Sequence, residues 1–471
     1  MIVANPGTLP ASASPALPAR RRFGFAIGDF GFNLYWQGLG LFLIYFQTDV
    51  LGIPAAWAGI CYLVASVWDG MTDPIVGALV DRTRTRWGKC RPYLLFGSVP
   101  LALAFALSFY APEMPLPGLV AFTLAGQMLV RGLYTSLAIP YSSLSAAITQ
   151  DCDERTALTG LRMQCAFLGG LAVAYLMPAL VPALGGADTR QGYGLAALCI
   201  GALATLSFLL CFLSVREPPV HEQAGGAAPL LPDAREFLRL VRRSGPLLRL
   251  LLGKSLVTFT LTMHTRNIVY FLKYILAAPE AVRYSMPLLT AASFLSVPFW
   301  VWIIRRGSKR QAWILGSLAT AGFSLCLRLP VALSLPWAVA LLCAVAASTT
   351  AYAVCFWAML PDTVEYNEWR FHRRDEAKVF GFASFTQKIA MGLSALVAGL
   401  YMEESGFLAN QAQGAGALEA IRTTMSLVPA LGALLSLLVM RGYGLDGGEH
   451  RRILGELAAR RAGGAAGRAG D

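Results

Sequence analysis

Residues 193–214, YGLAALCIGALATLSFLLCFLS, form a run of 22 residues without a charged side chain. A helix of about 20 apolar residues is long enough to cross a hydrocarbon core of roughly 30 Å. The stretch therefore predicts a transmembrane helix. Similar runs recur along the whole chain, in which 56% of the residues are hydrophobic, whereas soluble domains have about 45–50% apolar residues. Composition thus favours the membrane class from the outset.

Twelve such runs divide into two sets of six. They cover 23–48, 55–80, 93–111, 117–147, 157–183, 193–214, 246–276, 284–304, 311–328, 334–360, 379–402 and 421–441. The longest polar connection lies between the sixth and seventh runs. The predicted organisation is a disordered N-terminal tail (1–22), a six-helix bundle (23–214), a central loop (215–245), a second bundle (246–441) and a C-terminal tail (442–471).

The two halves also repeat local patterns. A proline is followed 14 residues later by an acidic residue and 20 residues later by a glycine in both halves, at Pro140, Glu154 and Gly160 and again at Pro361, Asp375 and Gly381. A basic loop follows the second run of each half, at 81–92 and 305–311. We therefore predict an all-α membrane protein with twelve transmembrane helices in two pseudo-symmetric six-helix bundles. This is the major-facilitator fold, in which substrate binds near the bilayer midplane between the halves.

The net charge of +12 follows from the placement of the basic residues. Most of the 39 Lys and Arg residues lie in the tails, the central loop and the loops on that same side, and only Arg190, Arg283, Arg328 and Arg422 lie in loops on the other side. The positive-inside rule then places both termini in the cytoplasm. We expect a multi-pass protein of the plasma (bacterial inner) membrane that functions as a monomer and binds no nucleic acid.

The two basic loops are expected to latch the cytoplasmic side through ion pairs and hydrogen bonds. Asp81, paired with a nearby arginine, is the preferred element of this latch. The full set of predicted gating residues is Asp81, Arg82, Arg86, Lys89, Arg305 and Arg306.

Other chemistries have no support in the sequence. The nine cysteines are odd in number and lack the spacing of a metal site. The loops contain no Walker, GxSxG, HExxH or kinase motif. We predict a protein that is not an enzyme and needs no cofactor.

Carboxylates inside the predicted spans indicate function. A charged side chain near the bilayer centre costs roughly 2.5–3.5 kcal/mol on insertion scales, yet Asp69 and Asp73 lie one helical turn apart in the second span. Two neighbouring carboxylates in a low dielectric repel each other, so one of them holds a proton or a cation lies between them. Their hard oxygen ligands suit a proton or an alkali cation (Na⁺ or Li⁺) rather than a transition metal. A structural alternative is that one of them caps the loop or pairs with an arginine.

The remaining intramembrane polar residues complete the predicted sites. The cation site consists of Asp69, Asp73 and Asp29, with Thr72 and Thr135 adding oxygen ligands. The substrate-binding residues are Asp29, Arg162, Tyr134, Asn33, Arg266 and Lys388. Lys388 beside the carboxylates could neutralise them in one conformation and release them in another. Lys273 lies near the outer end of its span, and we expect it to extend to the membrane surface.

Several motifs resemble those of the glycoside-pentoside-hexuronide:cation symporters, the family of the bacterial melibiose permease. They are FGFAIGDFGFNL, YFQTDVLGI, VWDGMTDPIVGALVDRTRTRWGKCRPYLLFG, AIPYSSLSAAIT, RNIVYFLKY, MLPDTVEYNEW and FTQKIAMG, spread over residues 23 to 441. The resemblance implies cation-driven sugar import by alternating access. It also implies that Asp69 and Asp73 bind the cation, that Asp29 and Arg162 bind sugar, and that Lys388 lies near both.

Three departures from the melibiose permease limit what the resemblance says about substrate. Gly28, Ala138 and Ser142 stand where that protein has a lysine, an acidic residue and a tryptophan. Melibiose itself is therefore not expected. The WD…TDP and MLPD patterns also occur in the animal sodium-dependent lysophosphatidylcholine symporters, so an amphiphile is the alternative substrate. A membrane receptor or scaffold that does not transport is the second alternative.

Overall fold

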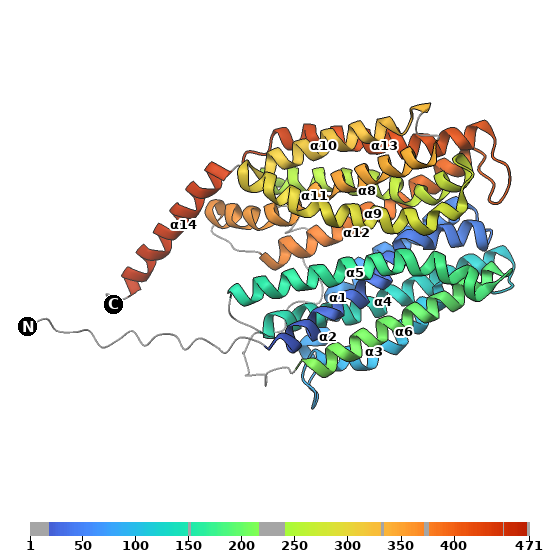
Figure 1. The fold of residues 1–471 in the computed structure, drawn as a ribbon. Coiled ribbons are helices and arrows are strands. Elements are labelled where there is room, and N and C mark those ends of the chain that lie inside the picture. Colours follow the sequence, from blue (N-terminus) through green and yellow to red (C-terminus); the bar gives the residue numbers. More distant parts are fainter. Residues whose placement is uncertain are drawn as a thin grey trace, which may run out of the picture.

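The structure, a computed structural model, describes residues 18–148, 152–215, 241–330, 334–371, 376–445 and 447–468. These residues form long helices in two groups. The first half contains α1 (Ala19–Tyr45), α2 (Ala55–Arg82), α3 (Arg91–Ser108), α4 (Leu116–Ile148), α5 (Cys152–Gly185) and α6 (Thr189–Ser214). The second half contains α8 (Gly245–Tyr270), α9 (Val282–Arg306), α10 (Lys309–Cys326), α11 (Leu335–Phe371), α12 (Glu376–Glu404) and α13 (Ala415–Arg441). The two groups lie side by side along their length (Figure 1).

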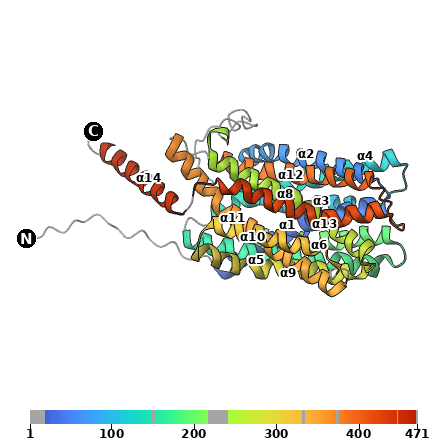
Figure 2. The ribbon, with the colours of Figure 1, turned by 90° about the horizontal axis from the view of Figure 1, so that it is seen from above.

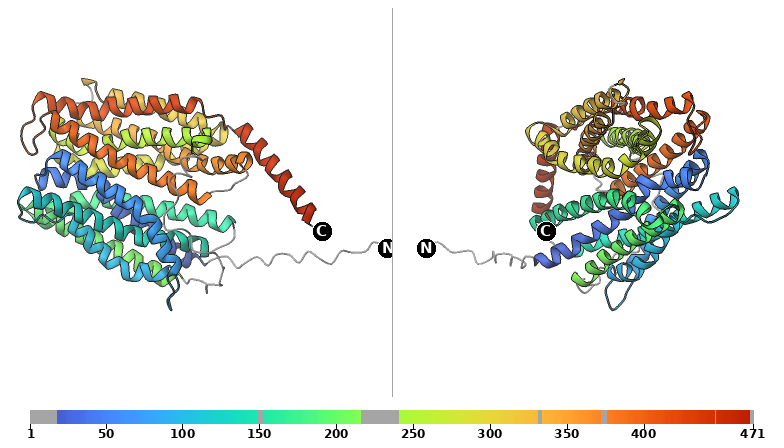
Figure 3. Two further views of the ribbon diagram at one scale, coloured as in Figure 1. Left: turned by 180° about the vertical axis from the view of Figure 1, so that it is seen from behind. Right: turned by 45° about the vertical axis from the view of Figure 1, so that its right-hand side comes forward.

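These twelve helices match the twelve predicted spans. The largest differences are at α11, which continues eleven residues past the predicted end, and at α13, which starts six residues earlier. α1 begins at Ala19, so four residues assigned to the disordered tail belong to a helix. The C-terminal tail contains a further helix, α14 (Gly447–Arg468), which extends from one end of the bundle (Figures 1 and 3). The central loop lies almost entirely outside the described residues.

Eight of the described helices are both long and apolar enough to cross a membrane on composition alone. The other four long helices are α1, α2, α10 and α12. α1, α2 and α12 carry charges within their spans (Asp29, Asp69 with Asp73, and Lys388), which lower their mean hydropathy. α10 has only 18 residues and begins with Lys309 and Arg310. The shortfall in these helices thus reflects charged groups and a short span.

The first helix of each half ends in the same irregular way. α1 continues into a π-helical turn, η1 (Phe46–Val50), and α8 continues into another, η2 (Phe271–Ile275). A single 3₁₀ turn, η3 (Pro279–Ala281), then leads into α9. Because a π turn inserts an extra residue into the helix and is frequent at functional sites, the matching turns are a structural sign of the repeat. We call the end of the bundle that contains η1 and η2 the outer end, and the end that carries α14 the inner end.

The halves meet through α2 against α12 and α5 against α9 (Figure 2 shows α2 beside α12). The α2–α12 contact depends on glycine. A Cβ at Gly59 would lie 2.5 Å from the carbonyl oxygen of Ala395, and a Cβ at Gly399 would lie 2.2 Å from that of Ala55. The small residues let the two backbones approach closely, as is common between membrane helices. These contacts lie towards the outer end.

The buried apolar side chains form two main clusters. One cluster joins the first half to the outer part of the second half, including Phe271, Leu342 and Met425. A second cluster belongs to the inner part of the second half, and Ile453 and Leu457 of α14 pack into it. The halves therefore share a core near the outer end, and α14 is fastened to the second half.

We predict that Gly399→Ala destabilises the protein by about 1–3 kcal/mol, because the new methyl group must push apart two backbones. Gly322→Ala in α10 is the matched control, since a Cβ there meets nothing within 4 Å. It should be neutral or should stabilise by up to about 1 kcal/mol through helix propensity. Thermal unfolding of the purified proteins in detergent measures both. Equal melting temperatures for the two variants would contradict the close packing of α2 on α12.

Candidate functional site

The predicted carboxylate pair of α2 lies between helices of both halves. Asp69 is buried, at 2% exposure, and the Asp73 side chain is one-third exposed. The Thr135 hydroxyl of α4 bridges the pair, at 2.9 Å from Asp69 Oδ1 and 3.1 Å from Asp73 Oδ1. The Thr72 hydroxyl donates instead to the backbone carbonyl of Asp69, at 3.0 Å. The structure thus brings Thr135, and not the Thr72 hydroxyl, onto the carboxylate oxygens.

Two cationic side chains contact the same pair. Lys388 of α12 places Nζ 2.6 Å from Asp73 Oδ2 and 3.2 Å from Asp69 Oδ1. Arg131 of α4 places Nη1 3.4 Å from Asp69 Oδ2. Since a buried charge needs a partner, Lys388 and Arg131 explain how two carboxylates persist in an apolar helix. Lys388 comes from the second half, so this cluster spans the interface between the halves.

Asp29 belongs to a separate cluster. Arg162 of α5 places Nε 2.5 Å from Asp29 Oδ2 and Nη2 3.4 Å from Oδ1. The Tyr141 hydroxyl lies 2.7 Å from Asp29 Oδ2, and its ring stacks on Phe25. Within the described residues, the Asp29 carboxylate contacts Arg162 and Tyr141 and does not contact Asp69 or Asp73. The structure therefore brings Asp29 to the predicted sugar-binding Arg162 but not to the predicted cation ligands.

Tyr134 is near both clusters. Its ring packs edge-on against Phe32, with 5.4 Å between centroids, and near Trp36. Asp29, Asp69 and Asp73 all lie close enough to act on it electrostatically.

A cavity of about 430 Å³ lies between the halves. Its lining comes from α1 and α5 of the first half and from α8, α9 and α11 of the second. Most of the lining residues are apolar, and Phe167 is among them. The polar lining residues are Asn33, Gln37, His264, Thr265, Thr290, Ser293 and Thr349. Asn33 also donates to the carbonyl oxygen of Asp29 at 2.9 Å. Of the predicted substrate-binding residues, Asn33 lines this cavity, whereas Asp29, Arg162, Tyr134, Arg266 and Lys388 lie outside its lining.

Comparison with known proteins identifies the family of this chain. Residues 24–447 match the family described as MFS/sugar transport protein. The chain belongs to this family of sugar transporters. It is 30% identical to the isoprimeverose transporter of Lactiplantibacillus pentosus over 94% of this chain and 92% of that protein. It is 28% identical to the glucuronide carrier protein homolog of Escherichia coli over 93% of this chain and 95% of that protein.

Solved structures share the fold at low sequence identity. The inward-open xylose transporter XylE from E. coli aligns with a TM-score of 0.63 at 15% identity, covering 90% of this chain and 96% of that one. A bacterial homolog of the human lysosomal transporter Spinster aligns with a TM-score of 0.68 at 15% identity, covering 91% of this chain and 98% of that one. The protein is thus a multi-pass membrane transporter with the major-facilitator fold.

The outer end of this sugar transporter carries a cluster that the sequence did not reveal. Asp49 of η1 is buried and bonds two residues of η2, with Oδ1 2.6 Å from Lys273 Nζ and 2.5 Å from the Tyr274 hydroxyl. Lys273 Nζ also lies 2.7 Å from Asn410 Oδ1. The predicted first span stopped at residue 48, one residue before Asp49. Lys273 is half-buried and ion-paired to Asp49, and its Nζ also contacts the exposed Asn410, so its head group has a carboxylate partner that the sequence analysis did not anticipate.

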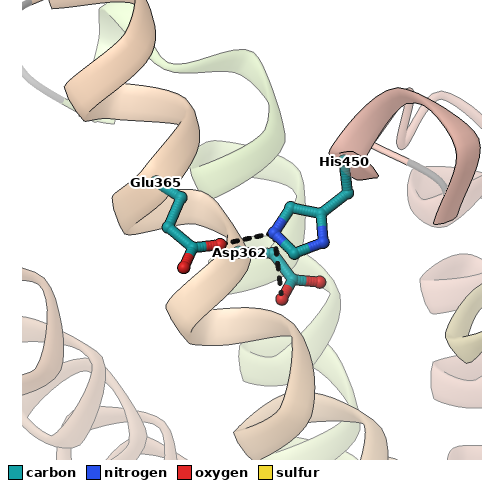
Figure 4. Close-up of side chains that lie close together, drawn as sticks. All are labelled: Asp362, Glu365 and His450. Carbon is teal, nitrogen blue, oxygen red and sulfur yellow. Dashed lines mark hydrogen bonds and ion pairs between the residues drawn. The ribbon is translucent and has the colours of Figure 1, made fainter. Parts of the chain in front are cut away.

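The inner end is fastened within the second half (Figure 4). Lys309 Nζ lies 2.9 and 2.7 Å from the two carboxylate oxygens of Asp362. His450 of α14 places Nε2 2.5 Å from Glu365 and 3.7 Å from Asp362. Asp362, Glu365 and His450 each bring one possible metal-ligand atom within 4.8 Å of the others. Lys309, however, already contacts both carboxylate oxygens of Asp362. We interpret the cluster as an ion-pair network that docks α14 on α11.

The predicted gating residues lie elsewhere at this end. Arg82 and Arg305 are exposed, and Lys89 is partly buried. Arg86 stacks on Trp87, and Arg306 stacks on Trp302. The side chain of Asp81 lies outside the described residues. A latch between the two basic loops stays a prediction.

We predict that Asp49→Asn opens the outer end, because it leaves the Lys273 ammonium without its buried carboxylate. Ser293→Cys, which lines the cavity, provides the probe. Labelling by a membrane-impermeant thiol reagent from the outer side should accelerate on the order of tenfold, since about 1.4 kcal/mol of lost pairing changes the open population tenfold.

Glu419→Gln is the control for this experiment. It removes an exposed ion pair to Arg328 that also lies at the outer end but within one half. It should leave the labelling rate unchanged. Unchanged labelling in Asp49→Asn would show that the pair does not hold the halves together.

Proposed function

We propose that the protein imports a glycoside or pentoside by symport with a cation, Na⁺ or H⁺, through alternating access. The observation that carries the proposal is the cavity shared by the two halves. A charged cluster, in which Lys388 pairs with Asp73, also joins the halves. The names of the relatives support a sugar as the substrate. The motif resemblance supports the cation, because Asp69 and Asp73 occupy the positions of the family's cation-binding pair.

The cavity favours a neutral hydroxylated substrate. Amide and hydroxyl groups line it, and these hydrogen-bond sugar hydroxyls, while Phe167 offers an aromatic face. Ligand pockets are typically about 300–1,000 Å³, and 430 Å³ suits a small saccharide. A hexuronide is less well matched, because its carboxylate would meet no Lys or Arg in the lining. A lysophospholipid is also less well matched, because its long acyl chain needs an additional apolar arm.

The contacts between the halves support an inward-facing state. Two of them close the outer end, Asp49 with Lys273 and Gly399 with Ala55, while the pair of Asp73 with Lys388 lies deeper between the halves. With both termini in the cytoplasm, as the charge distribution predicts, the cavity is closed to the outside. Alternating access then requires these contacts to break and others to form at the inner end. A cation drives the cycle only if its affinity differs between the two states.

Uptake into membrane vesicles tests the proposal. With imposed Na⁺, Li⁺ or H⁺ gradients, we expect accumulation of isoprimeverose or another neutral glycoside in preference to a glucuronide, and no competition by lysophosphatidylcholine. Asp69→Asn and Asp73→Asn should each reduce gradient-driven accumulation at least tenfold. Asn33→Ala should weaken apparent substrate affinity while ion dependence remains.

Asp188→Asn is the matched control. Asp188 caps the start of α6 far from the pair in sequence, and Asn caps helices equally well, so transport should be unchanged. Full gradient-driven accumulation by Asp69→Asn and Asp73→Asn at normal expression would reject cation coupling at this pair. Competition by lysophosphatidylcholine but not by sugars would select the amphiphile instead.

A further inference from the structure

The hydroxyl side chains that line the cavity already use their hydrogen-bond donors within the protein. The Thr290 hydroxyl donates to the carbonyl oxygen of Met286 at 3.1 Å. The Ser293 and Thr349 hydroxyls both donate to the carbonyl oxygen of Ala346, at 3.2 and 2.9 Å. Because a carbonyl oxygen only accepts, each hydroxyl proton is engaged in these bonds. The lone pairs of the three hydroxyl oxygens remain for a ligand.

His264 of α8 also donates to a backbone carbonyl. It lines the cavity, is 4% exposed, and places Nδ1 3.0 Å from the carbonyl oxygen of Met425 in α13. Nδ1 therefore carries a proton. In the described part of the chain no carboxylate contacts the ring, and a lone ionised group in a span is costly, so the imidazole is neutral. Its Nε2 is then a hydrogen-bond acceptor, which cannot become a donor by rotating as a hydroxyl does.

The amide of Asn33, in the first half, is held in a similar way. Its Nδ2 donates to the carbonyl oxygen of Asp29 at 2.9 Å, which leaves Oδ1 and one N–H for a ligand. Within the described residues, the side chains of Gln37 and Thr265 make no hydrogen bond, so both can donate to a ligand. Five of the seven polar lining residues thus donate to the backbone, and the cavity offers more acceptors than donors.

This excess of acceptors distinguishes between classes of substrate. A neutral sugar carries many hydroxyl groups, each with a proton to donate, whereas an ionised carboxylate only accepts. Two acceptors that face each other leave both without a partner, and a site built to bind a hydroxyl rejects an analogue that lacks it. Among the described lining residues there is also no Lys or Arg that could neutralise an anion.

We propose that His264 is a specificity-determining residue, whose fixed acceptor Nε2 binds a hydroxyl group of a neutral sugar and disfavours a carboxylate at the same position. The inference rests on the proposed sugar transport and names a residue and a chemical group that select the substrate. The bond to Met425 orients the ring before the sugar arrives. Little of the binding free energy is then lost in ordering this side chain.

Two substitutions separate contact with the sugar from packing. In His264→Asn, the amide nitrogen can take the place of Nδ1 and keep the bond to Met425, but no atom reaches the position of Nε2. In His264→Gln, the amide oxygen can reach that position as an acceptor, but the bond to Met425 is lost. A role in packing alone therefore ranks the two variants in the opposite order to a role in binding sugar.

The test measures exchange of labelled isoprimeverose, methyl β-xyloside and methyl β-glucoside by the purified full-length protein in proteoliposomes without an ion gradient. His264→Asn should raise the half-saturating concentration of the exchanged sugar about tenfold, while its maximal exchange rate and melting temperature stay near those of the wild type. His264→Gln should have a lower melting temperature, with a half-saturating concentration within about threefold of the wild-type value.

Methyl β-glucuronide provides a test that needs no variant. It differs from methyl β-glucoside by a carboxylate in place of the hydroxymethyl group. It should compete with the exchanged neutral sugar about tenfold more weakly than that sugar competes with itself. A glucuronide that competes as well as the neutral sugar would overturn the selection by acceptors.

The remaining outcomes distinguish this inference from the proposed function. An unchanged half-saturating concentration in His264→Asn, or a larger increase in His264→Gln than in His264→Asn, would make His264 a packing residue and leave sugar transport intact. A wild type that exchanges none of the three neutral sugars would overturn the proposed function, and this inference with it. Because exchange is measured without a gradient, a failure of cation coupling alone leaves the result unchanged.

Discussion

The pairing of charges inside the membrane is the constraint on which the arrangement of the helices depends. A lone ionised group in the hydrocarbon region is costly, and Asp29, Asp69 and Asp73 each have a cationic neighbour. Asp29 pairs with Arg162 and Asp69 with Arg131, both within the first half. Asp73 pairs with Lys388 of the second half. Lys388 is thus the cation of this cluster whose position depends on how the two halves are placed.

The outer end also contains an ion pair between the two halves. There too a carboxylate of the first half, Asp49, meets a lysine of the second half, Lys273. Both partners stand on π-helical turns at the ends of equivalent helices. Movement of one half against the other would separate both lysines from their carboxylates. Such a movement becomes less costly when something else neutralises the Asp73 carboxylate, which gives a coupling ion a physical role in the cycle.

The sequence predicted the fold well and the contacts between distant residues less well. Span positions follow from apolar length, which is a local property, and all twelve predicted spans have a helix. Asp69 and Asp73 stood out because two carboxylates one turn apart are costly in such a span. Spacing does not tell which neighbouring helix a side chain faces, however. Asp29 was therefore grouped with the α2 pair, although the structure pairs it with Arg162. Asp49 was missed because its partner Lys273 is 224 residues away.

At the inner end, too, the sequence did not predict which residues form ion pairs, but for a different reason. Basic residues in the loops are conspicuous in a sequence, yet they also serve to orient the chain in the membrane. The ion pairs that the structure shows there involve Lys309, Asp362 and His450. Lys309 begins α10 and Asp362 lies within α11, and the third lies on α14, a polar helix without an apolar run to mark it. A network assembled from three separate helices leaves no local signal in the sequence.

The separation of the neutral cavity from the charged clusters bears on how binding and coupling meet. Amide and hydroxyl side chains are among the residues that line the cavity, whereas Asp29, Asp69 and Asp73 and their cationic partners are not in its lining. Asn33 joins the two regions, because its side chain lines the cavity and its amide donates to the backbone carbonyl of Asp29. A substrate that repositions Asn33 therefore acts on the α1 segment that carries Asp29 without itself contacting a charge.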